Sequence, residues 1–358
     1  MDYSFFINRS KYIIRQLVSW VYYYLSCYKL VHEGKVLILM YHRVIKDKDD
    51  AKEYLQPGMY VSESSFKKQM EFINRNYIII SLNSLIDAWK KGDLDKCKKY
   101  CVVTFDDGWL DNYQNAYPIL KQYNIPATIF LATSYVGTNR WFWPDKLSHL
   151  LKISNKQIIL KYLKNEYSEL SESNKIFIKF KYFIENNNSL EGRELIDAGI
   201  ETFKEYPENE INKALNKLFR LLDVQLPLKR ITLNWEEIHE MSNNGISFGS
   251  HTCNHKILTT ISTQEVDSEL KESIKTIKAK NINYVSVFCY PNGNYNKTIE
   301  SKVKDSGYEA AVTTKYGFEN AINQCHYKIK RVGVHDDVSS TMALFAFHIS
   351  GLHQLLRN

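Results

Sequence analysis

The 358-residue sequence lacks the cysteine spacing of a disulfide-rich or zinc-clip protein. Its six cysteines, at positions 27, 97, 101, 253, 289 and 325, form no regular framework, and no second Cys/His pair lies near Cys97 and Cys101. We therefore expect reduced thiols in a non-oxidising compartment, which indicates a cytoplasmic protein. The sequence also lacks an Arg-rich recognition helix, so its net charge of +7 is not taken to indicate nucleic-acid binding.

A long hydrophobic run is also missing. The longest mostly apolar stretch, Leu17 to Leu25, is far shorter than the ~20 residues that a membrane-spanning helix needs. Arg9, Lys11 and Arg15 precede it, and no small-residue cleavage site follows, so the segment is a poor secretory signal. Residues 1–34 are predicted to form an amphipathic helical segment. It either packs on the domain or makes peripheral contact with a membrane through its aromatic side chains.

Apolar strand-like runs alternate with amphipathic helical segments along most of the chain. This pattern predicts a parallel sheet covered by helices, either a β/α barrel or an open sheet. A distorted (β/α) barrel is favoured because polar residues suited to catalysis follow several of the runs, as they do at the carboxyl ends of barrel strands. The expected strands are 35–42, 100–107, 127–133, 245–251, 284–291 and 308–314, and the expected helices are 64–76, 109–124, 262–281 and 296–307.

Residues 138–233 interrupt this alternation with helical patterns and no convincing strand. They are predicted to form a helical insertion that divides the barrel into a first part, 35–137, and a second part, 234–358. The insertion begins with the aromatic stretch "RWFWPDKL" (140–147), which could line a sugar-binding cleft or plug the insertion onto the barrel. After the insertion, Asn234 and Glu237 are spaced as a capping box at the start of a helix.

Two short motifs carry the residue types needed for hydrolysis. His251 and His255, in "SHTCNH", are four residues apart, so on a helical turn both imidazoles would share a face and could hold one cation. Asp106 and Asp107 follow a hydrophobic strand. Either pair alone could be purely structural, the histidines as a packed pair and Asp-Asp-Gly as a turn. Together they suggest a metal held by two histidines and one aspartate, with the second aspartate as the base for a bound water.

These motifs resemble those of a known family. "TFDDG" (104–108), "SHTCNH" (250–255) and "YPNGNYN" (290–296) are similar to the three main motifs of the polysaccharide deacetylases, the NodB-homology group of carbohydrate esterase family 4. The similarity extends to "LILMYHRV" (37–44) and "YNIPATIFLATSYVG" (123–137), and covers 35–137 and 234–335. It implies a distorted (β/α) barrel that hydrolyses the N-acetyl group of an amino sugar.

The resemblance also implies roles for individual residues. Asp107, His251 and His255 would hold a divalent cation, zinc being the expected metal. Asp106 would be the general base, and His42 would be the acid that protonates the leaving amine.

The third motif would provide the oxyanion and substrate site. The backbone N–H of Asn292 would donate to the developing oxyanion, next to Tyr290 and Pro291. Many relatives carry an arginine two residues before this proline, where it braces the base, but this chain has Cys289. Arg331 is a candidate replacement.

Other readings stay open on the same residues. Rival candidates for the acid are His326, His335, His348 and His353. Cys253 is left out of the metal site, because on a helix it would face away from both histidines. The substrate is expected to be an N-acetylated polysaccharide or lipid-linked glycan. The alternatives are a deformylase or another small amidase on the same barrel, and a glycan-binding module without catalysis.

Overall fold

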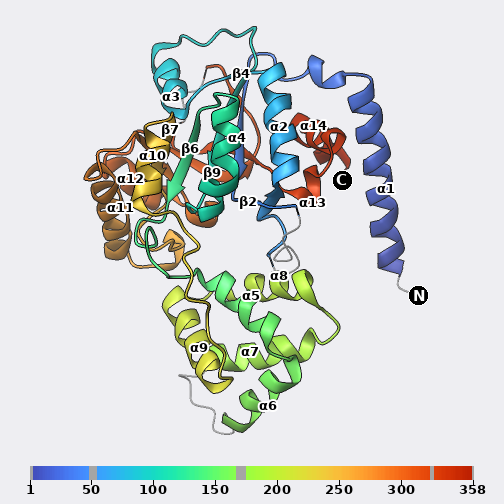
Figure 1. Ribbon diagram of the computed structural model, residues 1–358, viewed down its shortest axis with the longest axis vertical. Coiled ribbons are helices and arrows are strands. Elements are labelled where there is room, and N and C mark those ends of the chain that lie inside the picture. The colour runs from blue at the N-terminus through green and yellow to red at the C-terminus, as the bar shows by residue number, and fades with distance from the viewer. Residues whose placement is uncertain (1–2, 48–54, 167–174, 323–325, 357–358) are drawn as a thin grey trace.

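The computed structural model describes residues 3–47, 55–166, 175–322 and 326–356. Its centre is a closed barrel of parallel strands, shown in the upper part of Figure 1. The order around the ring is β1-β11-β9-β8-β7-β6-β5, and β5 pairs with β1 to close it. The ring strands are β1 (Lys35–Tyr41), β5 (Tyr100–Phe105), β6 (Ala127–Leu131), β7 (Ile246–Ser250), β8 (Tyr284–Cys289), β9 (Ala310–Tyr316) and β11 (Ile329–Gly333).

The ring strands are hydrophobic because most of them are covered on both faces. Every residue of β5, β6 and β7 is buried, the pattern expected when side chains alternately fill the barrel and pack under helices. The barrel prediction and all six expected strands are therefore confirmed. The strand β11 was not predicted, since "IKRVG" alternates apolar and basic residues. Four short strands lie outside the ring: β2 (Arg43–Ile45), β3 (Tyr60–Ser62), β4 (Ile78–Ile79) and β10 (Glu319–Asn320).

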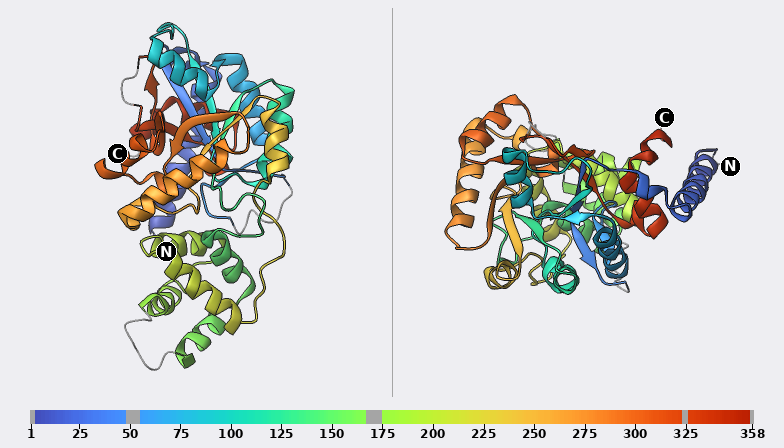
Figure 2. Two further views of the ribbon diagram at one scale, coloured as in Figure 1. Left: turned by 90° about the vertical axis from the view of Figure 1, so that its left-hand side faces the viewer. Right: turned by 90° about the horizontal axis from the view of Figure 1, so that it is seen from above.

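Helices surround the barrel, as Figure 2 shows from two further sides. Asn234 caps α10 and Glu237 returns the bond to the Asn234 backbone, so the predicted capping box is present. The expected helix at 109–124 is instead a π-helical turn, Asn112–Ala116, followed by a short α4. The helices around the barrel are α2 (Glu63–Asn76), α3 (Leu82–Lys91), α4 (Tyr117–Gln122), α10 (Trp235–Ser242), α11 (Thr263–Lys278), α12 (Lys297–Asp305), α13 (Asp336–Ser339) and α14 (Met342–Ser350).

The five helices α5 to α9, which lie between β6 and α10 in the chain, form a separate lobe, drawn below the barrel in Figure 1. They enclose a hydrophobic cluster of their own, in which Phe180 stacks on Phe203 with ring centroids 4.0 Å apart. Arg193 joins this lobe to the barrel through a two-bond ion pair with Asp337, at 2.9 and 3.0 Å. The helices are α5 (Trp143–Ile153), α6 (Lys156–Glu166), α7 (Lys175–Asn186), α8 (Gly192–Phe203) and α9 (Glu208–Leu221).

The first helix, α1 (Tyr3–Tyr24), stands at the outer edge of the molecule beside the C-terminal helices (Figures 1 and 2). It packs mainly on α14, where Tyr22 meets Phe347 edge to face at 5.7 Å. A short 3-10 turn, Cys27–Leu30, then leads into β1. Among the described helices, none combines the length and apolar character needed to cross a membrane.

Candidate active site

The carboxyl ends of the barrel strands deliver polar side chains to one cleft of about 640 Å³ between the barrel and the insertion. His42 follows β1, the pair Asp106 and Asp107 follows β5, and His251 follows β7. Each of these four side chains lines the cleft, and so does Asn292, which lies in the 3-10 turn Pro291–Gly293 after β8. Parallel strands bring residues far apart in the sequence to the same rim, which is where barrel enzymes hold their sites.

Asp107, His251 and His255 converge on one point of this cleft. Oδ1 of Asp107 lies 3.3 Å from Nε2 of His251 and 3.2 Å from Nε2 of His255. Oδ2 of Asp107 accepts a hydrogen bond from Nε1 of Trp109 at 2.9 Å, which turns Oδ1 towards the histidines. Burial alone would raise the pKa of Asp107, but hydrogen bonds with both histidines hold it well below its usual range. One carboxylate oxygen and two imidazole nitrogens within shared reach form a donor set suited to a divalent cation.

The loop that carries the histidines is not the predicted helical turn. Residues 251–257 contain no helix, and Thr252 and His255 have left-handed φ values of 67° and 58°. The buried carboxylate of Glu269 fixes this loop by accepting from the backbone N–H groups of Cys253 and Asn254, both at 2.8 Å. The helix-based spacing argument for the pair was therefore wrong, although the two rings do meet, with centroids 4.9 Å apart.

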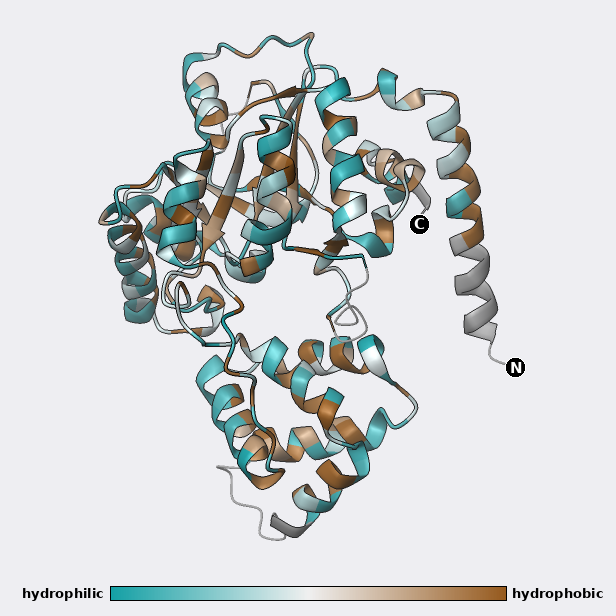
Figure 3. Ribbon diagram, in the orientation of Figure 1, coloured by the Kyte–Doolittle hydropathy of each residue, from teal (hydrophilic) through white to brown (hydrophobic). Residues whose placement is uncertain are grey.

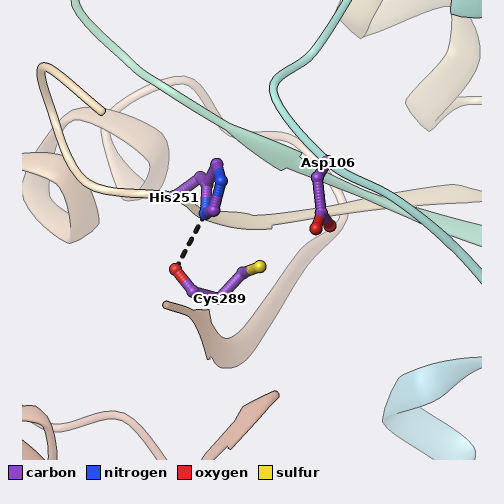
Figure 4. A group of neighbouring side chains, drawn as sticks. All are labelled: Asp106, His251 and Cys289. Atoms are coloured by element: carbon purple, nitrogen blue, oxygen red, sulfur yellow. Dashed lines mark hydrogen bonds between the residues drawn. The ribbon is translucent and has the colours of Figure 1, made fainter. Parts of the chain in front are cut away.

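A backbone carbonyl orients His251. Nδ1 of His251 lies 2.8 Å from the carbonyl oxygen of Cys289, the contact drawn as a dashed line in Figure 4. Because a carbonyl can only accept, Nδ1 carries a proton. Nε2 donates to Asp107 while the histidine is charged, and the neutral ring offers the lone pair of Nε2 to a cation. Such an outer hydrogen bond is the usual partner of a metal-binding histidine.

Asp106 forms an ion pair with a different residue, Arg331 of β11. The guanidinium of Arg331, fully buried, donates two hydrogen bonds to the carboxylate oxygens of Asp106, each of 2.7 Å. It also donates to Sγ of Cys289 at 3.3 Å, so the arginine occupies the space beside the residue that replaces the family's bracing arginine. Arg331 of β11 thus contacts Asp106 in place of an arginine at position 289.

A second possible ligand group shares His251 with the first. Asp106, His251 and Cys289 have ligand atoms within 4.8 Å of one another and are all buried (Figure 4). Both oxygens of Asp106 already accept from Arg331, however, and burial raises the pKa of the Cys289 thiol well above its usual range. A neutral thiol and a paired carboxylate are poor ligands. The donor atoms therefore favour the group built on Asp107.

The two candidate proton-transfer groups lie side by side. Nε2 of His42 is 4.0 Å from Oδ2 of Asp106. Burial opposes ionisation of Asp106, but the guanidinium of Arg331 holds its pKa below the usual carboxyl range, so this carboxylate is charged at neutral pH. Burial lowers the pKa of His42, although Asp107 and Asp106 oppose this.

The third motif reaches the cleft through one of its three candidate residues. Asn292 lines the cleft with a left-handed φ of 56°, and its carbonyl accepts from Oγ1 of Thr314 at 3.3 Å. The ring of Tyr290 is buried under the helices, stacked on Tyr295, and its backbone N–H bonds to the carbonyl of Val312. Pro291 is buried and has no N–H to offer. Only Asn292 of the three is placed to contact a substrate.

The rival histidines have other surroundings. Among the described residues that line the cleft, the histidines are His42, His251 and His255. His326 stacks on Trp89, and His335 bonds to Asp337 at 3.2 Å. His348 and His353 pack against each other and against Tyr316, and burial lowers the pKa of His348 to about 3.

The aromatic stretch at the start of the insertion both lines the cleft and packs the insertion against the barrel. Phe142 packs on Trp109, Tyr135 and His255, which joins the insertion to the barrel beside the candidate metal ligands. Trp143 belongs to the cluster within the insertion, and both rings line the cleft.

Asp145, in the first turn of α5, brings a carboxylate to the same wall. Burial raises its pKa to about 6, an effect that Arg43 opposes and Asp107 reinforces.

Comparison with known proteins points in one direction. A family model described as polysaccharide deacetylase matches residues 93–172 and 205–311, together more than half of the chain. These ranges contain the Asp107, His251 and His255 group but leave out His42 and Arg331. The poly-beta-1,6-N-acetyl-D-glucosamine N-deacetylase of Staphylococcus epidermidis is 27% identical over 235 residues, which is 62% of this chain and 74% of that protein.

Two solved structures have a similar fold. The Streptococcus pyogenes deacetylase PplD, in complex with acetate, matches with a TM-score of 0.54 at 21% identity. The match covers 85% of this chain and 94% of the PplD chain. IcaB from Ammonifex degensii matches with a TM-score of 0.53 at 17% identity. The match covers 87% of this chain and 97% of the IcaB chain.

Proposed function

This chain belongs to the polysaccharide deacetylase family, and we propose that it removes N-acetyl groups from a glycan of N-acetylated amino sugars at the site built on Asp107, His251 and His255. One observation supports this most directly. Of two adjacent aspartates, Asp107 faces two histidine nitrogens while Asp106 is paired with Arg331. The division leaves one carboxylate to bind a cation and its neighbour to exchange a proton.

The donor set fits zinc. Two neutral imidazole nitrogens and one carboxylate oxygen form the three-ligand set of hydrolytic zinc sites, and the orienting bonds from Trp109 and Cys289 are the outer contacts that such sites use. When bound there, the cation would polarise the acetyl carbonyl and lower the pKa of a water.

The chain's own residues would carry the proton transfers. Asp106, kept ionised by Arg331, would accept a proton from the attacking water, whose oxygen bonds to the acetyl carbon. The backbone N–H of Asn292 would donate to the carbonyl oxygen as negative charge develops on it. His42 would give a proton to the sugar nitrogen as the C–N bond breaks. The products are acetate and a free amino sugar.

The substrate class follows from the cleft and the relatives. The wall contributed by the insertion presents aromatic rings and carboxylates, which suit the apolar faces and hydroxyl groups of a sugar chain. The S. epidermidis relative is named for poly-β-1,6-N-acetyl-D-glucosamine. We take this polymer as the first substrate to test.

The test is release of acetate from β-1,6-linked N-acetylglucosamine oligomers, with β-1,4-linked and N-formylated oligomers in parallel. A chelator should abolish release, and added Zn²⁺ should restore it. Asp107→Ala should lose bound metal and reduce kcat/KM by about a thousandfold or more, because it removes a ligand from the reacting centre. Asp305→Ala, an exposed aspartate on α12, is the matched control and should behave as wild type.

Retention of both metal and turnover by Asp107→Ala would refute the site. Preference for the formylated oligomers would instead favour the deformylase alternative.

A further inference from the structure

Helix α1 exposes the side chains that a packed helix would bury. Six large apolar residues, which we call the α1 apolar face, are between 49% and 73% exposed. They recur at helical spacing and so lie along one side. Figure 3 shows hydrophobic residues along the described part of this helix. The members are Ile13, Ile14, Leu17, Trp20, Val21 and Tyr24.

The opposite side of α1 is the one that contacts the protein, and it combines polar residues with aromatic rings. Arg15 donates to the carbonyl of Val338 at 2.6 Å, Ser19 is fully buried, and Tyr22 packs on Phe347. These three residues are also at helical spacing, and they lie across the helix from Leu17 and Val21. The helix is therefore attached through this side, and its orientation on α14 holds the α1 apolar face outwards.

The charged residues of helix α1 have one sign. No acidic residue occurs from Tyr3 to Tyr24, whereas Arg9 and Lys11 lie in the helix, Arg15 lies on its protein-facing side, and Lys29 follows it. An amphipathic helix with a basic character and exposed tryptophan and tyrosine has the composition of helices that lie in the headgroup region of a bilayer. Trp20 stacks on Tyr24 at 5.3 Å, which places two interface-seeking rings together.

We propose that the α1 apolar face inserts into the interface of a membrane containing anionic lipids and holds the protein on that surface. A second copy of the chain fits less well, because pairing through α1 would bring the basic residues of two helices together without a carboxylate between them. Leu25 and Leu30, which follow the helix in the chain, are also exposed, at 65% and 85%.

Co-sedimentation of the full chain with vesicles tests this proposal without any substrate. Vesicles of equal parts phosphatidylcholine and phosphatidylglycerol should bind the chain, and vesicles of phosphatidylcholine alone should bind it more weakly. The variant Leu17→Gln, Trp20→Gln, Val21→Gln should lower binding at least about tenfold, because three apolar side chains no longer leave water. Since all three are exposed, its thermal unfolding should match that of wild type.

The matched control replaces three exposed apolar residues of the insertion, Ile153→Gln, Ile158→Gln and Leu228→Gln, which are 55%, 49% and 94% exposed. It should bind vesicles as wild type does. Equal loss in both triple variants, or equal binding to neutral and anionic vesicles, would overturn the proposal. So would a concentration-dependent dimer in sedimentation velocity that the α1 variant abolishes, since it would assign the face to a second copy.

Discussion

The barrel and the helical insertion are built on different principles, although each encloses a hydrophobic core. Among the described residues 143–221, Ser148 is the one buried polar side chain. The barrel buries Asp106, Asp107 and His251 just after its strands and Arg331 within β11, each no more than 5% exposed. Burying a charged group is unfavourable unless the group is paired. A concentration of buried charged groups in one region is therefore typical of a functional site.

The insertion therefore acts through its surface. Its interior is apolar and ordinary, but the end that faces the barrel brings Phe142, Trp143 and Asp145 to the cleft. This difference predicts that changes in the barrel alter turnover and proton transfer, whereas changes in the insertion alter substrate binding. The experiments below, ordered by the expected size of the effect on deacetylation, test that division.

His42→Gln should have the largest effect. Removing a general acid lowers kcat by about 10² to 10⁴-fold. Because burial lowers the pKa of His42, the protonated acid is lost at a lower pH than for an exposed histidine. The alkaline limb of the kcat/KM profile should accordingly lie at or below the usual histidine range and vanish in the variant. His335→Gln, a rival outside the cleft, is the control, and an equal loss there would show that the acid has been misassigned.

Arg331→Met should reduce kcat/KM by about a hundredfold, since the base loses the group that positions it. Asp106 works only when ionised, and burial without the guanidinium raises its pKa, so the acidic limb of the profile should move to higher pH. The unpaired buried carboxylate should also lower the free energy of unfolding by about 3–5 kcal/mol.

Lys330→Met, which removes the same charge from the neighbouring position of β11, should leave both the profile and the stability unchanged. An acidic limb that stays in place in Arg331→Met would mean that Asp106 is not the base.

Asp145→Ala should act on binding. Its carboxylate on the insertion wall can accept hydrogen bonds from sugar hydroxyls, and losing such a bond to a charged group should raise KM by about tenfold. The kcat should stay within about twofold of wild type in steady-state assays on oligomers. Glu194→Ala, an exposed acid of the insertion away from the cleft, is the matched control. A fall in kcat with unchanged KM would place Asp145 in the reacting centre. It would contradict the assignment of turnover to the barrel and of substrate binding to the insertion.

Phe203→Ala should affect catalysis least. This fully buried ring stacks on Phe180 in the core of the insertion, and its loss should cost about 3–5 kcal/mol of stability there. Hydrogen exchange should speed up in the insertion helices while amides of β5 and β7 keep their protection, and kcat below the unfolding range should be unchanged. Equal acceleration in the barrel would show that the two regions unfold as one unit.

Much of the barrel could be predicted from local pattern. Continuous apolar runs ending in polar residues identified six of the ring strands, and the paired aspartates and histidines identified the site. β11 could not be predicted, because the burial of its basic residue depends on partners from distant parts of the chain. Arg331 is buried where it donates to Asp106 after β5 and to the carbonyl of Thr313 in β9. The histidine loop was mistaken for a helix because spacing alone does not reveal the left-handed backbone at Thr252 and His255.

By itself, the sequence determined the strand and helix periodicities, the candidate ligands and the basic, apolar character of the first helix, because these depend on residues close together in the chain. The tertiary structure alone decided which aspartate faces the histidines, which arginine neutralises the other, and which side of α1 faces outwards. Those outcomes depend on contacts between segments hundreds of residues apart. The closure of the barrel brings Arg331 to Asp106, and the packing of α1 beside the C-terminal helices brings Arg15 to Val338.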